Sequence, residues 1–211
     1  MAFTRSLALA GAFIIAAGAA SAASLLDLTS AGAQKTGTLA GTGYAITAVG
    51  GSLNNSQSYD GGAKPTGAIA DLLAFQRDGY GVKDDEVTYP GERIVVTFDQ
   101  AVRLTGVAFL DLFRKSNGHP GEFVALTVDG AAPTIFNSVC PYQTCGGYVE
   151  FGALDLVGKV FSFAAGHRND GVGRPDFALA AIQVAAVPVP AAGLLLLGAL
   201  GGLRATRRRM A

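Results

Sequence analysis

The stretch ERIVVTFDQAVRLTGVAFLDLF, Glu92–Phe113, carries the clearest structural signal in the 211-residue chain. At its start, Ile94, Val96 and Phe98 alternate with other residues, and this period of two predicts a β-strand with one buried face. Strand-like composition resumes at Val102, so a second strand is expected before the stretch ends. The stretch therefore predicts two strands of a sheet that has a core side and a solvent side.

Six other short runs have the same strand-like character and are separated by turn residues. They are GYAITAVGG around Ile46, EFVALTV at 122–128, PTIFNSV from Pro133, GGYVEFGAL at 146–154, GKVFSFAAG at 158–166 and FALAAIQVAAV at 177–187. Asp129-Gly130 indicates a hairpin turn between two of these runs, and AIADLLAFQR at 68–77 is the exception with helical spacing. About eight strands with little helix predict an all-β fold, a single β-sandwich of jelly-roll type.

The N-terminal segment, residues 1–22, has the three parts of a secretory signal peptide. Arg5 supplies a positive charge, residues 7–20 form an uncharged apolar core, and Ala20-Ser21-Ala22 has the small-x-small pattern of a cleavage site. An equally good site lies one residue later. We therefore expect the chain to be exported and to lose this segment. The alternative is an uncleaved membrane anchor, which the short apolar stretch disfavours.

The C-terminal segment, residues 187–211, combines a proline motif, an apolar run and a basic cluster. The uncharged run, residues 190–203, would form a helix of roughly 21 Å, shorter than the ~30 Å hydrocarbon core of a bilayer. A span that starts at Val184 would be long enough, with the prolines in its first turns. The basic cluster is Arg204, Arg207, Arg208 and Arg209. By the positive-inside rule it stays in the cytoplasm, so we predict a short C-terminal transmembrane helix.

The proline motif is Val187-Pro188-Val189-Pro190-Ala191. Together with the apolar run and the arginines, it resembles the PEP-CTERM class of bacterial sorting signals, most closely the VPLPA-CTERM variant, which has leucine in place of Val189. The resemblance implies recognition by an exosortase-type membrane protease, removal of the tail, and release or attachment at the cell surface. It also implies a Gram-negative bacterium that secretes exopolysaccharide. A plain C-terminal membrane anchor is the alternative interpretation.

Residues 23–186 lie between these ends and suit one domain with its own core. They carry all 16 acidic residues and 11 of the 16 basic residues, a net charge of −5, although the whole chain is neutral. A nucleic-acid-binding protein normally has a basic face, so we do not expect nucleic acid as a partner. The charge is compatible with binding of cations or neutral glycans.

The two cysteines, Cys140 and Cys145, lie five positions apart in CPYQTC. An exported chain meets an oxidising compartment, so a small loop closed by a disulfide is the favoured interpretation. A metal-binding pair is the alternative, but there is no second cysteine pair and neither histidine lies within a few residues. A redox-active pair normally has the tighter C-x-x-C spacing.

The most suggestive polar stretch is DGYGVKDDEVTYPGE, Asp78–Glu92. Asp84, Asp85 and Glu86 stand together before an expected strand, and Asp176 or Asp170 could reach the same sheet edge from the other end of the domain. Calcium prefers several oxygen ligands, which loop carboxylates supply, so a calcium site is one hypothesis. The other interpretation, an acidic loop that protects an edge strand from aggregation, is favoured over it.

Motifs of common enzyme classes are missing from the sequence. There is no G-x-S-x-G, H-E-x-x-H or P-loop pattern, and the two histidines, His119 and His167, sit in turn-like stretches. A glycosidase needs only two carboxylates, so that chemistry stays open, but the chain has no tryptophan to form a sugar platform. We therefore expect no enzyme activity and no cofactor, with a structural calcium ion as the one open hypothesis.

Three functional hypotheses follow. The first is an exported, non-enzymatic cell-surface or extracellular-matrix protein that associates with exopolysaccharide or surface proteins. It would be anchored in the inner membrane until its tail is cleaved. The second is a carbohydrate-binding module with a structural calcium ion. The third, ranked below these, is a glycan hydrolase that uses a pair of carboxylates.

Overall fold

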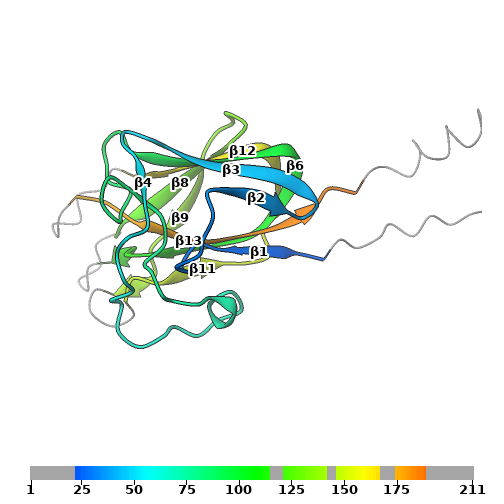
Figure 1. Ribbon diagram of the computed structural model, residues 1–211. Coiled ribbons are helices and arrows are strands. Elements are labelled where there is room, and N and C mark those ends of the chain that lie inside the picture. The colour runs from blue at the N-terminus through cyan, green and yellow to red at the C-terminus, as the bar shows by residue number, and fades with distance from the viewer. Residues whose placement is uncertain (1–21, 115–120, 142–145, 167–173, 189–211) are drawn as a thin grey trace, which may run out of the picture. The chain divides into compact units, whose positions relative to one another are not determined.

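The computed structural model describes residues 22–114, 121–141, 146–166 and 174–188, and these form an all-β fold (Figure 1). Within these ranges there are thirteen strands and one turn of 3-10 helix. They are β1 (Ser24–Asp27), β2 (Thr36–Leu39), β3 (Thr42–Val49), β4 (Leu53–Asn54), η1 (Ala70–Leu72), β5 (Gly81–Val82), β6 (Arg93–Leu110), β7 (Phe113–Arg114), β8 (Phe123–Val128), β9 (Thr134–Asn137), β10 (Cys140–Pro141), β11 (Val149–Phe151), β12 (Leu156–Ala165) and β13 (Ala178–Ala186). The expected all-β character is confirmed.

Nine of the described strands belong to one large sheet in which every pairing is antiparallel. Its main path runs β1-β13-β6-β12-β8-β9. β3 and β11 also pair with β6, and β2 pairs with β3. Two small sheets, β4 with β5 and β7 with β10, lie outside this path.

β6 connects the two halves of the large sheet because it is 18 residues long and changes partners along its length. Its first part, Arg93–Phe98, pairs with β3, whereas Val102–Leu110 pairs with β13. β12 pairs with both parts and shifts register between Gly158 and Val160, opposite this change. The two halves lie on different sides of the core (Figure 1), an arrangement consistent with a β-sandwich.

The two strands that the sequence predicts within Glu92–Phe113 are one continuous strand, β6, in the structure. The polar break at residues 99–101 stays within β6 because neighbouring strands bond to it. The N–H of Gln100 donates to Oγ1 of Thr42 at 3.0 Å, and Nζ of Lys159 donates to the carbonyl of Asp99 at 2.9 Å. Contacts from distant parts of the chain thus overrule a local signal that favours a turn.

The other six expected strands are present as β3, β8, β9, β11, β12 and β13. The structure adds β1, β2, β4, β5, β7 and β10, each two to four residues long. Runs this short contain too few positions for alternation to be visible. The hairpin at Asp129-Gly130 is confirmed between β8 and β9, and both of its residues have positive φ, 49° and 77°. Residues 68–77 form only the single turn η1.

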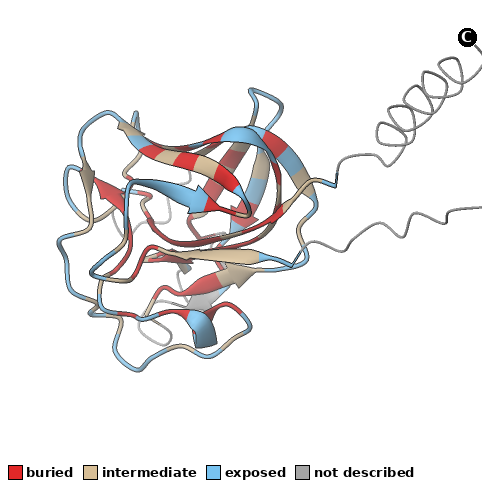
Figure 2. Ribbon diagram, turned by 45° about the vertical axis from the view of Figure 1, so that its right-hand side comes forward, coloured by how far each residue is buried: buried red, intermediate tan, exposed pale blue. Residues whose placement is uncertain are grey.

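The core lies between the two halves of the sheet, and burial alternates with exposure along its strands (Figure 2). Phe109 on β6 is fully buried in it. The ring centroid of Phe109 lies 5.5 to 6.3 Å from those of Phe136, Phe151, Phe163 and Phe177. Aromatic rings from β9, β11, β12 and the segment before β13 thus meet at one side chain, which ties the two halves together.

Candidate functional site: an acidic face

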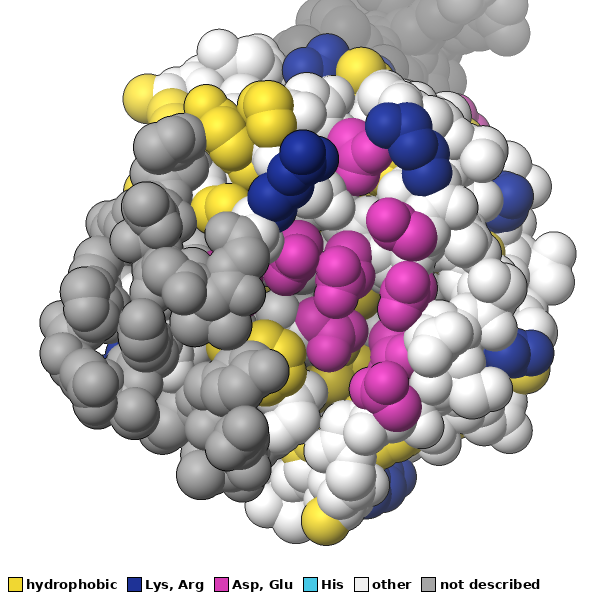
Figure 3. Space-filling model, turned by 90° about the vertical axis from the view of Figure 1, so that its left-hand side faces the viewer, with side chains coloured by type: hydrophobic (Ala, Val, Ile, Leu, Met, Phe, Trp, Pro, Cys, Tyr) yellow, Lys and Arg dark blue, Asp and Glu magenta, His cyan; other side chains and the backbone are white. Residues whose placement is uncertain are grey.

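Carboxyl side chains gather on one face of the domain (Figure 3), and seven of them interact with one another there. We call this set the acidic face. Its members are Asp60, Asp78, Asp84, Asp85, Glu86, Asp111 and Asp176. All seven stand in loops or turns between strands. Their proximity is therefore a product of how the strands pair, because they come from five separate places in the sequence.

The start of β13 brings two of these loops together. Tyr80 and Leu179 exchange two backbone hydrogen bonds of 3.0 and 2.9 Å, which places Asp78 beside this strand. β6, the neighbour of β13, ends at Leu110, and Asp111 is the next residue. Asp78 and Asp111 thus reach the same end of the β6–β13 pair from opposite directions.

A second backbone contact brings Glu86 to Asp176. The N–H of Val87 donates a 2.7 Å hydrogen bond to the carbonyl of Phe177, and the N–H of Tyr89 donates a 2.9 Å hydrogen bond to the carbonyl of Pro175, so the segment after Glu86 runs antiparallel to the segment that holds Asp176. The carboxyl groups of Glu86 and Asp176 are hydrogen-bonded to each other. This hydrogen bond acts to lower the pKa of Glu86.

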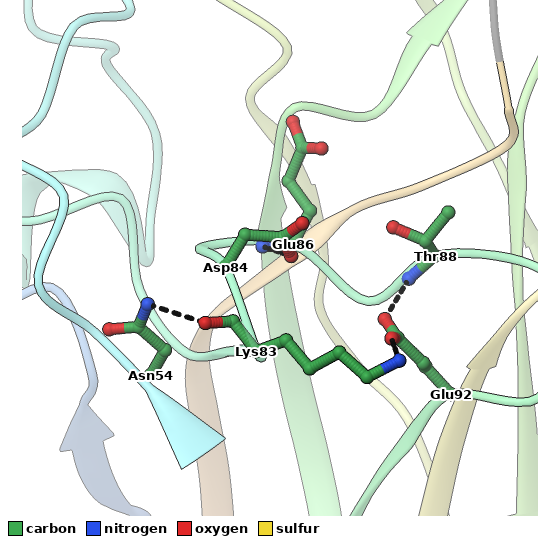
Figure 4. Close-up of polar contacts among 6 residues, drawn as sticks. All are labelled: Asn54, Lys83, Asp84, Glu86, Thr88 and Glu92. Carbon is green, nitrogen blue, oxygen red and sulfur yellow. Dashed lines mark hydrogen bonds and ion pairs between the residues drawn. The ribbon is translucent and has the colours of Figure 1, made fainter. Parts of the chain in front are cut away.

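The turn that carries Asp84, Asp85 and Glu86 is held by its own polar contacts (Figure 4). The carboxylate of Asp84 accepts a 3.4 Å hydrogen bond from the N–H of Glu86. Lys83 forms a 2.7 Å ion pair with Glu92, and Figure 4 shows its side chain extending away from that of Glu86. The lysine closest in sequence to the acidic face is therefore paired with a carboxylate outside it.

Asp111 has the most perturbed titration on the acidic face. Burial raises the pKa of its carboxyl from 3.8 to about 8, and the charges of Asp78, Glu86, Asp60 and Asp85 add to the shift. At neutral pH this carboxyl is mainly protonated. The proton on this carboxyl reduces the repulsion among the neighbouring like charges.

Burial also raises the pKa values of two neighbours of Asp111, namely Asp78 and Glu86. Asp78 is 2 % exposed, and burial raises its pKa to about 6, although the N–H of Asp60 donates a 3.3 Å hydrogen bond to it. Burial also raises the pKa of Glu86, followed by the charge of Asp85, and the hydrogen bond with Asp176 acts in the opposite direction. Each of these groups would ionise more easily beside a cation.

Carboxyl groups of this kind can exchange their protons for a bound cation. Calcium would be the cation most compatible with an all-oxygen set of loop ligands. Among the residues that the structure describes, however, no group of three or more Asp, Glu, His or Cys side chains is arranged to hold a metal ion. The acidic face offers neighbouring carboxylate oxygens without a preformed coordination shell.

The four residues predicted as calcium ligands, Asp84, Asp85, Glu86 and Asp176, all belong to the acidic face. Glu86 and Asp176 are in contact, and the charges of the other two act on Glu86. The sequence interpretation missed Asp60, Asp78 and Asp111. One usable signal was present: Asp111 interrupts the apolar run VAFLDLF, where a carboxylate has to be accommodated next to the core.

Two further predictions concern residues at the margins of the described chain. Cys145 lies outside the described residues, as do His119, His167 and Asp170, so the Cys140–Cys145 disulfide stays a prediction. Val187 and Pro188 are described, but residues 189–211 are not, and these include the rest of the sorting motif, the predicted transmembrane helix and the arginine cluster. No helix in the described ranges is long and apolar enough to cross a membrane.

No protein-family model matches this chain, and no curated protein matches it either. The function therefore has to be inferred from the residues and their arrangement.

Proposed function

We propose that this protein is an exported, non-enzymatic cell-surface or extracellular-matrix protein, delivered by a C-terminal sorting signal of the PEP-CTERM type. Its folded part is a β-sandwich of jelly-roll type. An exosortase-type protease removes the tail, and exopolysaccharide or other surface proteins are its partners.

The pairing of the first and last strands supports this proposal. β1 begins at Ser24 and β13 ends at Ala186, and the two strands run antiparallel with Ser24 opposite Val184. The predicted cleavage site after Ala22 and the motif that starts at Val187 lie just outside this pair. Cutting at both sites would remove no described strand, so the domain would keep its backbone hydrogen bonds after processing.

The test is the intact mass of the protein recovered from the envelope and the medium of its own host. We expect a mass that lacks residues 1–22 and everything after about 187–191. As a matched control, the double variant Pro188→Ala/Pro190→Ala should keep its tail and stay in the membrane fraction. A wild-type protein that retains Arg204–Ala211 and is found only in membranes would show an ordinary anchor and overturn the proposal.

A carbohydrate-binding module with a structural calcium ion is the second candidate, and the acidic face is the observation that favours it. Burial and, after it, the charges of neighbouring carboxylates raise the pKa values of Asp78, Glu86 and Asp111, and a calcium ion would offset both effects and so stabilise the fold. The expected result is a higher unfolding temperature with calcium than with a chelator. If Asp84→Asn/Asp85→Asn leaves that difference unchanged, the predicted site is wrong.

A further inference from the structure

The outer face of the large sheet is hollowed over β6, β12 and β8. The hollow has a volume of about 490 Å³. Sites for small ligands usually measure roughly 300–1,000 Å³. Gly130 and Pro133, from the turn between β8 and β9, line the hollow together with the strands. This is the opposite side of these strands from the buried core residues, and none of the acidic face belongs to it.

The floor of the hollow consists of two rows of residues. Each row contains one residue from β6, one from β12 and one from β8, which face one another across the strands. The rows are Val95–Ser162–Thr127 and Arg93–Ala164–Ala125. Neighbouring strands lie about 4.8 Å apart, so three strands give a floor about 10 Å wide. The two alanines in the second row leave space beside Arg93.

Three lining side chains carry hydrogen-bonding groups that find no partner within the described ranges of the chain. Among the described residues, the guanidinium of Arg93 and the hydroxyls of Ser162 and Thr127 make no hydrogen bond or ion pair. Arg93 is exposed and is the charged member of the described lining. A guanidinium fork binds a carboxylate through two parallel hydrogen bonds. The hollow therefore offers one carboxylate site beside two hydroxyl sites.

We propose that this hollow binds a segment of a carboxylate-bearing polysaccharide, with a sugar carboxylate on Arg93 and sugar hydroxyls on Ser162 and Thr127. The C–H groups of the sugar ring lie against Val95 and Val160, which also line the hollow. The described lining contains no aromatic side chain, so polar contacts rather than ring stacking select the ligand. This inference rests on the proposed function, because an acidic exopolysaccharide is then the surface partner.

Because the domain as a whole is negatively charged, binding of an acidic polysaccharide would depend on the positive charge of Arg93. Residues 23–186 carry a net charge of −5, so the overall field repels a polyanion. Binding then depends on the local cation and on short-range hydrogen bonds. Loss of Arg93 should therefore cost more affinity than loss of an arginine outside the hollow.

The experiment measures binding of oligogalacturonate to the full-length chain in detergent, at physiological ionic strength. The methyl-esterified oligomer, which has the same backbone without the charge, is the ligand control. Arg93→Gln should weaken binding by about tenfold or more, since a charge-assisted bidentate contact is lost. Arg103→Gln, which removes a half-buried arginine of the same strand that pairs with Asp155 outside the hollow, should leave the affinity unchanged.

Arg93-dependent binding of the acid form alone would support the proposal. The proposal is overturned if the protein binds the methyl ester as tightly as the acid form, or if Arg93→Gln leaves the affinity for oligogalacturonate unchanged. Binding to neutral glycans only, or no binding at all, would also overturn it. Self-association that Ala125→Leu abolishes would also overturn it, because a second copy would then occupy the hollow. The mass measurement in the host tests the sorting proposal independently of the binding assay. If the tail is removed but binding does not depend on Arg93, only the glycan site is refuted. If the tail is retained but binding depends on Arg93, only the sorting proposal is refuted.

Discussion

The phenolic hydroxyl of Tyr148 donates a 2.7 Å hydrogen bond to Oε2 of Glu150. The same carboxylate accepts hydrogen bonds of 2.8 to 2.9 Å from the N–H groups of Ala68, Ile69 and Ala70. A single side chain beside the core thus binds the start of η1, which has no side-chain cap of its own. Burial acts to raise the pKa of Glu150, but these hydrogen bonds outweigh it and lower the pKa overall.

Glu150→Gln should lower the free energy of unfolding by about 2 kcal/mol at neutral pH, because a charged acceptor of four hydrogen bonds becomes a neutral one. Tyr148→Phe, which removes one of these bonds, should cost about 1 kcal/mol. Urea unfolding of both variants measures the difference. Since the folded pKa of Glu150 is lowered, its contribution is complete above the unfolded pKa of 4.5 and disappears as the pH falls through the folded pKa. Equal losses in the two variants would contradict the capping role.

The pKa of Asp111, raised to about 8, predicts that stability falls as the pH rises from about 4 to 8. The folded state binds more protons than the unfolded state in this range, so the slope is negative, up to roughly 1.4 kcal/mol per pH unit for one group. Asp111→Asn removes this titration, and asparagine tolerates the positive φ of 56° at this position. Urea unfolding over this pH range should show a flatter profile and higher stability at pH 8 for the variant. A profile that matches the wild type would show that Asp111 ionises normally.

Gly147 packs against the backbone of Asp111, and a Cβ at this position would lie 2.6 Å from its Cα. Gly147→Ala should therefore destabilise the fold and disturb the acidic face. Gly130→Ala is the matched control, because Gly130 also has positive φ but nothing within 4 Å of a Cβ. The control should cost about 1–2 kcal/mol for its backbone conformation alone, and Gly147→Ala clearly more. Similar unfolding temperatures for the two variants would refute the close contact.

Phe109 is fully buried and contacts four other aromatic rings. Phe109→Ala should lower the free energy of unfolding by about 3–5 kcal/mol through lost burial and the cavity left behind. Leu72, 59 % exposed, provides the comparison, and Leu72→Ala should change stability by less than about 0.5 kcal/mol. Chemical unfolding of both variants gives these values. A loss below about 1 kcal/mol at Phe109 would mean that the two halves of the sheet are not joined through this side chain.

The strands were predictable where local alternation is strong. Ile94, Val96 and Phe98 face the core as expected, and Asp129-Gly130 forms the expected turn. A period of two is a property of neighbours in the chain, so it can be recognised without knowledge of the partner strands. The same reasoning placed a break inside β6, because the contacts that Gln100 and Asp99 make with distant residues leave no local signal.

The candidate sites were predictable only in part. The run Asp84–Glu86 is conspicuous in the sequence, but the burial of Asp78 and Asp111 beside it depends on how β13 pairs with its neighbours. The hollow left no signal that could have been recognised, because alternate residues of three strands line it and each strand alone looks ordinary. Its polar groups become a set only when the register aligns Arg93, Ser162 and Thr127 on one face.

By itself, the sequence determined the all-β character of the domain, the positions of its longer strands and the acidic charge of residues 23–186. The tertiary structure alone decided that β6 is continuous, that seven carboxyl groups share one face and that Arg93, which pairs with none of the described residues, stands in a hollow. The physical reason is the range of the interactions. Backbone alternation acts over a few residues, whereas burial, pKa shifts and shared surfaces arise from strand pairings between residues far apart in the chain.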